Sequence, residues 1–119
     1  MSEGVTLKVD RTARGDGVVV IELAGELVVT NREELRRRAE AEIEGGARGL
    51  VVTVGRLSHI DTSGLAMLVH LASRCAAAGG RLAVVGLRDD FAEMRQHLYL
   101  DEALVFAEDV EDAVAAVSR

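Results

Sequence analysis

The chain has 119 residues, of which 49% are apolar and only 3% aromatic, so it is long enough to bury one core built from aliphatic side chains. Its 14 basic and 20 acidic residues give a net charge of −6, which argues against direct binding of nucleic acid, because phosphate contacts dominate that affinity. We expect one cytoplasmic domain over residues 1–119, because the single cysteine, Cys75, cannot form an internal disulfide and the N-terminus shows no signal-peptide pattern. We expect no membrane insertion, because no apolar stretch reaches the about 18 residues that a membrane span needs.

The first part of the chain predicts two strands joined by a tight turn. Residues 5–9 alternate between apolar and polar side chains, as a short edge strand does. Residues 14–17, Arg-Gly-Asp-Gly, are typical of a hairpin turn. Residues 18–24 follow as a second strand. An antiparallel pair is therefore expected at one edge of the sheet.

A first helix is predicted after residues 30–33, whose sequence Thr-Asn-Arg-Glu has the form of a capping box. Glycines at 45 and 46 end it. Two ion pairs at a spacing of four residues are expected, Glu33 with Arg37 and Glu34 with Arg38. We interpret Arg36–Arg38 as part of the solvated face of this helix. The apolar stripe consists of Leu35, Ala39 and Ile43.

The rest of the chain alternates strands and helices. Strands are predicted over residues 50–54, 82–85 and 104–106, and a helix over residues 63–78. Asp89 or Asp90 is expected to cap a third helix, and Asp109 a last one. The predicted class is α/β, with a mixed four- to five-stranded sheet and about four helices packed on it.

Residues 57–65 lie between a predicted buried strand and a helix, so Asp61–Gly64 fall at a helix N-terminus. A hydroxyl there has two interpretations. In the first, Asp61 or Thr62 only caps the helix. In the second, a hydroxyl accepts a phosphate, whose charge the free N–H groups and the helix dipole stabilise. A partner docked over the same loop would then meet a new dianion, so the domain would act as a switch without catalysis of its own.

The chain resembles STAS-domain proteins, specifically the bacterial anti-sigma factor antagonists. The matching elements occur in the family's order and span nearly the whole chain. They are Leu-Ala-Gly-Glu-Leu at 23–27, the strand at 50–54, Ile-Asp-Thr-Ser-Gly-Leu at 60–65, and Gly-Gly-Arg-Leu at 79–82.

This resemblance implies phosphorylation at Thr62, the hydroxyl residue directly after the aspartate, with Ser63 as the alternative. It also implies an anti-sigma factor that is a serine/threonine kinase of the histidine-kinase fold, which binds the unphosphorylated chain and releases its sigma factor. A serine/threonine phosphatase would restore the unmodified form. We expect a monomer with no cofactor and no enzymatic activity. The switch loop that would contact the partner consists of Ser58, His59, Asp61, Thr62, Ser63 and Gly64.

Two departures from the family keep another function open. The family often has Asp where this chain has Val28, and it usually has Ser at the position of Thr62. The chain could instead be a non-switching accessory subunit of a lipid-transport or sensory assembly. No metal site is expected, since the spacings of the three histidines and Cys75 match no zinc pattern. We expect Val28 and Val29 to be partly buried, and residues 98–100, Leu-Tyr-Leu, to pack into the core. The alternative for both segments is an apolar contact for a partner.

Overall fold

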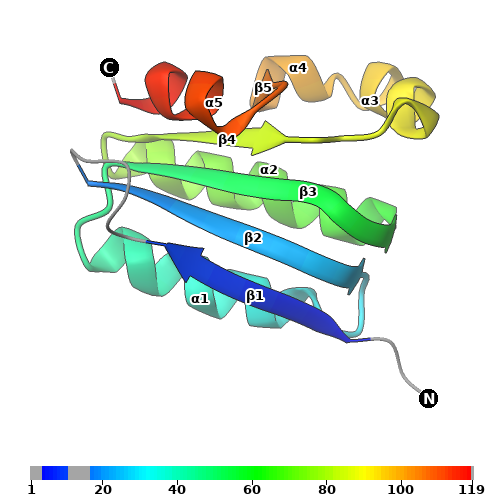
Figure 1. Ribbon diagram of the computed structural model, residues 1–119, viewed down its shortest axis with the longest axis horizontal. Coiled ribbons are helices and arrows are strands. Elements are labelled where there is room, and N and C mark those ends of the chain that lie inside the picture. The colour runs from blue at the N-terminus through cyan, green and yellow to red at the C-terminus, as the bar shows by residue number, and fades with distance from the viewer. Residues whose placement is uncertain (1–3, 11–16, 119) are drawn as a thin grey trace.

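A mixed sheet forms the centre of the computed structural model, which describes residues 4–10 and 17–118 (Figure 1). Its five strands stand in the order β1-β2-β3-β4-β5, with β1 antiparallel to β2 and all other pairs parallel. This confirms the predicted mixed sheet; the expected turn at residues 14–17 falls largely outside the described residues. The strands are β1 (Val5–Asp10), β2 (Val18–Leu27), β3 (Gly49–Ile60), β4 (Arg81–Val85) and β5 (Val105–Ala107).

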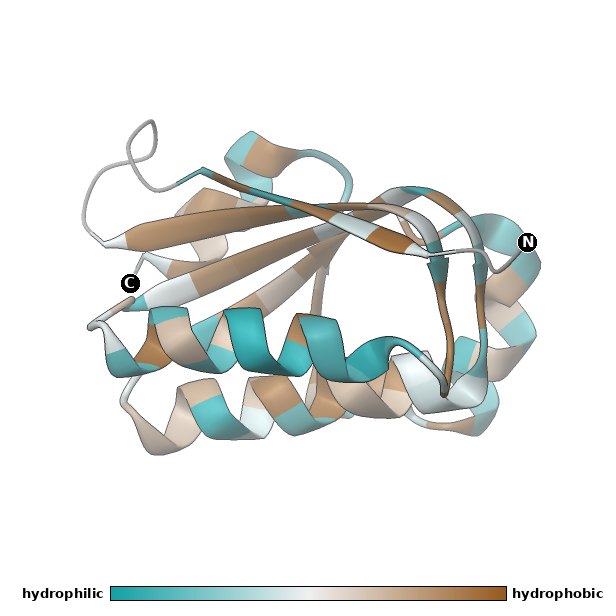
Figure 2. Ribbon diagram, turned by 90° about the horizontal axis from the view of Figure 1, so that it is seen from below, coloured by the Kyte–Doolittle hydropathy of each residue, from teal (hydrophilic) through white to brown (hydrophobic). Residues whose placement is uncertain are grey.

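Helices cover both faces of the sheet. On one face, α1 (Arg32–Glu44) and α2 (Thr62–Ala77) lie side by side, as Figure 2 shows, with the hydrophilic side of α1 turned outward. On the other face, α5 (Val110–Val117) packs on β3 and β4. Alternate residues of the central strands β2, β3 and β4 therefore enter two cores. The larger core includes Leu23, Leu35, Val52, Leu65, Leu68 and Leu71, and the smaller one Val18, Val20, Val51, Ala83, Ala113 and Val117.

Between β4 and β5 the chain forms three short helical segments: a 3-10 turn over Asp89–Phe91, α3 (Ala92–His97) and α4 (Leu100–Ala103). The described residues thus contain one α-helix more than the four expected. Asp89 and Asp90 lie inside the 3-10 turn, and neither caps α3, so that prediction is wrong. Asp109 does cap α5, since its side chain accepts a hydrogen bond of 2.8 Å from the amide of Asp112.

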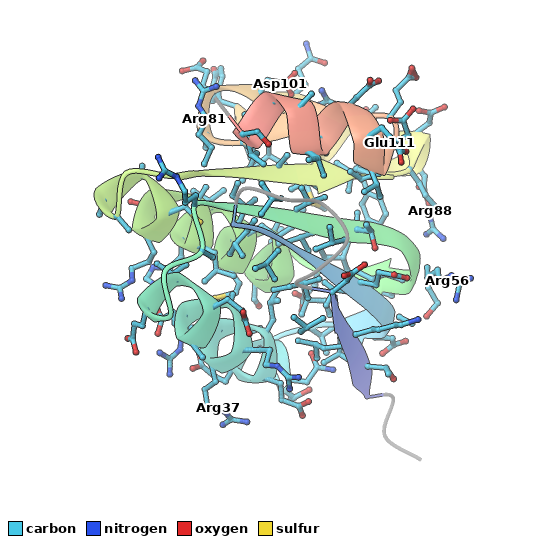
Figure 3. All side chains as sticks on the ribbon, turned by 60° about the vertical axis from the view of Figure 1, so that its left-hand side comes forward. Arg37, Arg56, Arg81, Arg88, Asp101 and Glu111 are labelled. Atoms are coloured by element: carbon cyan, nitrogen blue, oxygen red, sulfur yellow. The ribbon has the colours of Figure 1, made fainter. Side chains whose placement is uncertain are left out.

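The start of α1 differs from its prediction. The N-cap is Asn31 rather than Thr30, and no capping box forms. The Asn31 Oδ1 accepts a hydrogen bond from the amide of Val28 at 3.0 Å, so this side chain closes the preceding turn and does not cap the helix. Glu33 pairs with Arg36 instead of Arg37. Arg37 points away from the domain (Figure 3), as expected of a solvated face.

Candidate functional site

The site predicted at the N-terminus of α2 is built at the far end of β3. This strand continues to Ile60 instead of ending at residue 54, and beyond Thr53 it pairs with β2 alone. Ser58 and His59 therefore lie on a strand and not in a loop. Both are exposed, and the Ser58 hydroxyl donates to the carbonyl of Gly25 at 3.1 Å. Because this part of β3 pairs with a single strand and exposes its side chains, its sequence is polar and lacks the apolar run that marks the buried part of the strand.

Asp61 caps α2 and also binds a second loop. Its Oδ1 accepts a hydrogen bond from the amide of Gly64 at 2.9 Å, and its Oδ2 accepts one from the amide of Val29 at 3.2 Å. Partial burial opposes ionisation of this carboxyl, but hydrogen bonds from Gly64, Val29 and Ser63 together outweigh it and lower the pKa of Asp61 below its ordinary value. A charged carboxylate thus joins the start of α2 to the connection between β2 and α1.

Gly64 allows α2 to start close to the end of β2. A Cβ atom at this position would lie 2.7 Å from the carbonyl oxygen of Leu27 and 2.8 Å from Cγ1 of Ile60. The same carbonyl accepts the amide of Asp61 at 3.2 Å. Glycine is therefore required for the close approach of α2 to the end of β2. This approach fixes the positions of Thr62 and Ser63 at the start of α2.

The two candidate acceptors differ in accessibility. Thr62, the first residue of α2, is exposed, whereas Ser63 is half-buried. The carbonyl of Ser63 accepts a hydrogen bond of 3.4 Å from Arg32 of α1. Because Asp61 is the cap, the Thr62 hydroxyl is not needed to start the helix. Of the two interpretations, the structure assigns capping to Asp61 and not to Thr62.

A groove of about 520 Å³ begins at these hydroxyls. None of the residues along it carries a charge. The groove is lined by Thr62, Ser63, Ala66, Val69, Leu98 and Leu100. It joins the start of α2 to the turn between α3 and α4, two parts of the chain far apart in sequence.

Three large apolar side chains are exposed in the part of the chain that the structure describes: Val29 at 60%, Leu98 at 47% and Tyr99 at 69%. The predicted core packing is correct for Leu100, which is 2% exposed, but wrong for Leu98 and Tyr99. Tyr99 has left-handed backbone angles, φ 53° and ψ 41°, and the chain reverses there between two short helices, so only Leu100 reaches the core. Val28 is half-buried, as expected, whereas Val29 is not.

Within residues 4–10 and 17–118, no three His, Cys, Asp or Glu side chains are grouped so that they could hold a metal ion. Over the same residues, no helix combines the length and the apolar character needed to cross a bilayer. What the site offers chemically is an exposed hydroxyl next to a capping carboxylate, at the mouth of an uncharged groove.

Comparison with known proteins finds a family that matches most of the chain. A family model described as the STAS domain matches residues 11–113. BtrV of Bordetella bronchiseptica, named as a candidate anti-sigma factor antagonist, is 28% identical over 79 residues, which cover 66% of this chain and 68% of BtrV.

Solved structures share the fold at lower identity. The crystal structure of an anti-sigma factor antagonist from Mycobacterium paratuberculosis has a TM-score of 0.82 at 20% identity, over 98% of this chain and 96% of that one. The phosphorylated form of the Bacillus cell fate determinant SpoIIAA has a TM-score of 0.70 at 24% identity, over 93% and 98% of the two chains. At these identities the similarity establishes the fold alone.

Proposed function

This chain belongs to the STAS domain family, and from that membership we propose that it is an anti-sigma factor antagonist switched by phosphorylation. The unmodified chain binds an anti-sigma factor and thereby releases a sigma factor. Similarity to BtrV supports this class of function. The chain itself acts as a binding protein in the cytoplasm, as a monomer, and not as an enzyme.

The observation that carries the proposal is the exposed Thr62 hydroxyl at the mouth of an uncharged groove. A kinase domain of the anti-sigma factor transfers the γ-phosphoryl group of ATP to this oxygen; the hydroxyl proton goes to a base of the kinase, and ADP leaves. The product carries about −1.5 to −2 charges on the first turn of α2, where the helix dipole tolerates them. The fold is kept, but a partner bound over Thr62 meets a dianion.

A serine/threonine phosphatase closes the cycle by hydrolysing the phosphate ester with water, which returns the hydroxyl and releases inorganic phosphate. The remaining switch-loop residues have distinct roles in this scheme. Asp61 and Gly64 hold the start of α2 in place. Ser58 and His59 are exposed polar residues of β3, the strand before Thr62, and they contact the partner when it is bound over Thr62.

The test is to isolate the chain with its partners from its own cells, and then to incubate the purified chain with the recovered anti-sigma factor and ATP. We expect one phosphate on the peptide that carries Thr62. Thr62→Ala should abolish the modification and Ser63→Ala should preserve it; the reverse pattern would assign Ser63. A chain that never gains phosphate would refute the switch.

A second candidate function rests on Val28. The family that the chain resembles often has an aspartate here, whereas this chain has a half-buried valine and so lacks that acidic side chain. A non-switching accessory subunit of a lipid-transport or sensory assembly would need no such acid. Recovery of a transporter ATPase or a scaffold subunit, with no phosphate under any growth condition, would favour this second function.

A further inference from the structure

The turn between α3 and α4 exposes two adjacent large apolar side chains, Leu98 and Tyr99. Exposed single apolar residues are common, but neighbouring ones beside a groove mark an interaction site more often. Leu98 also lines the groove that begins at Thr62. Leu98 and the proposed phosphate acceptor therefore line one groove, and Tyr99 follows Leu98 directly in the chain.

Tyr99 is held in a conformation that its residue type disfavours. With φ at 53°, it is the only described non-glycine residue with a positive φ. Glycine or asparagine adopts this region with less strain than a bulky aromatic residue does. Because the aromatic ring is also 69% exposed, packing inside the domain does not explain why tyrosine stands here. Such strain is characteristic of functional positions.

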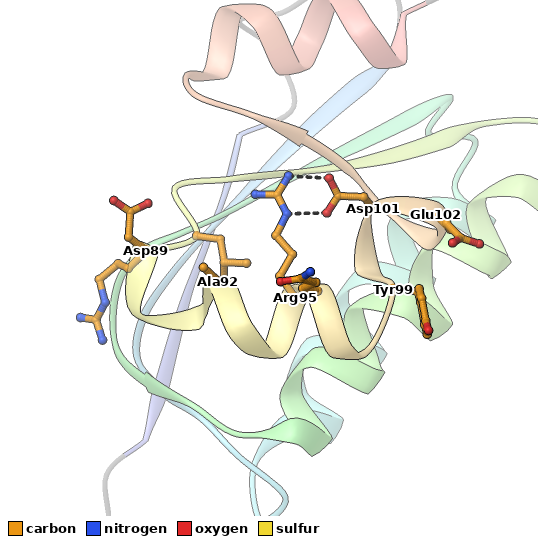
Figure 4. Close-up of a pocket in the computed structure, with 9 residues that line it drawn as sticks. Asp89, Ala92, Arg95, Tyr99, Asp101 and Glu102 are labelled. Atoms are coloured by element: carbon orange, nitrogen blue, oxygen red, sulfur yellow. Dashed lines mark hydrogen bonds and ion pairs between the residues drawn. The ribbon is translucent and has the colours of Figure 1, made fainter.

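Arg95 and Asp101, which line a second pocket together with Tyr99, brace the turn. Arg95 Nε and Nη2 donate to the two carboxylate oxygens of Asp101 at 2.5 and 2.8 Å, so one ion pair spans the turn (Figure 4). The guanidinium also lies 3.9 Å from the centre of the Phe106 ring on β5. The Tyr99 ring points away from this pair (Figure 4). A rigid turn presents an aromatic anchor at a low entropic cost on binding.

We propose that Leu98 and Tyr99 are the apolar anchor through which the anti-sigma factor docks on this chain, an inference that rests on the proposed function. The position of Leu98 relative to Thr62 indicates the anti-sigma factor as the partner. A kinase that transfers phosphate to Thr62 must reach the mouth of the groove, and the protein surface that does so also covers Leu98. Since the lining of this groove is uncharged, the part of the partner that covers Leu98 is apolar, whereas Tyr99 lies beside the charged residues Arg95 and Asp101 of a second pocket. Phosphate at Thr62 then places a dianion at the edge of an apolar contact, which opposes docking.

The experiment measures the affinity and the phosphorylation kinetics of the anti-sigma factor that modifies Thr62. Tyr99→Gly removes the ring and relieves the left-handed strain, so the variant should unfold at no lower temperature than the wild type. Its affinity should nevertheless fall by at least about tenfold, as expected for loss of an aromatic hot spot. The KM for the chain as kinase substrate should rise while kcat stays unchanged.

Matched variants separate the ring from the backbone. Tyr99→Phe should keep the affinity within about threefold, and Ala115→Ser on the exposed side of α5 should leave it unchanged. Leu98→Ser supplies a second test without any change at the strained position, with a similar loss expected. If Tyr99→Gly and Leu98→Ser bind like the wild type, the inference is overturned while the switch stands. If the wild-type chain itself binds no anti-sigma factor, the proposed function fails and the inference with it.

Discussion

Replacing Gly64 by alanine tests whether the start of α2 depends on close backbone approach. The added Cβ would lie 2.7 Å from the Leu27 carbonyl oxygen and 2.8 Å from Ile60 Cγ1, so at least one neighbour must move by several tenths of an ångström. Overpacking of this kind costs about 3 kcal/mol at the upper end of its usual range. Alanine also gains about 1 kcal/mol over glycine inside a helix. The overpacking term is larger, and we expect a net loss of about 2 kcal/mol.

Urea unfolding measures this loss as a lower midpoint at an unchanged slope. Ala66→Gly, at an exposed position of the same helix, is the matched control, because it reports the helix-propensity term alone and should cost about 1 kcal/mol. A Gly64→Ala variant as stable as the wild type would refute the reasoning. It would mean that the end of β2 moves away from the added methyl group at little cost in free energy. The contact between Gly64 and Leu27 would then not fix the position of Thr62.

Two further substitutions and one chemical modification test the packing of the domain and the support of the site. Asp61→Ala removes the acceptor for the amides of Gly64 and Val29 and should lower the free energy of unfolding by about 1–2 kcal/mol; a loss below about 0.5 kcal/mol in urea titrations would contradict the capping role. Because the folded-state pKa of Asp61 is lowered, its contribution is complete above its unfolded pKa of about 3.9 and disappears as pH falls through the folded value, so the gap between wild type and variant should close in acid. Gly25→Ala should cost at least about 2 kcal/mol, since φ is +97° and a Cβ would lie 2.2 Å from the Gly4 carbonyl oxygen; near-wild-type unfolding would mean that β1 simply shifts. Burial raises the pKa of Cys75 to about 11, so iodoacetamide at neutral pH should alkylate it slowly in the native chain and rapidly in urea, and equal rates would show that the core opens around it.

The sequence predicted those helices and strands correctly whose side chains are buried on one face or on both faces. The aliphatic run at residues 50–54 and the helix predicted over residues 63–78 appear close to where they were expected, because a strand buried on both faces and an apolar stripe leave strong patterns. The last part of β3 was missed because its exposed residues are polar and only β2 supports it. Strand pairing there is a tertiary effect that a local pattern does not record.

Those features of the site that depend on local sequence were predicted, and those that depend on contacts between distant parts of the chain were not. A cap at Asp61 is a local feature, and the motif Asp-Thr-Ser-Gly indicates it directly. By contrast, the second bond of Asp61, to Val29, joins residues far apart in sequence. Core packing was preferred over a partner contact for residues 98–100, because they read as one apolar run, and this was wrong for Leu98 and Tyr99. Only the left-handed turn at Tyr99 divides this run into an exposed and a buried part.

The central claim is that phosphate at Thr62 decides whether the partner binds. The most direct measurement is a titration of the anti-sigma factor with the unmodified chain and with the chain phosphorylated at Thr62, at the same salt concentration. A dianion placed at the edge of an uncharged contact should weaken binding by about hundredfold or more. Equal affinity of the two forms would contradict the account and leave a STAS domain that binds its partner without a switch.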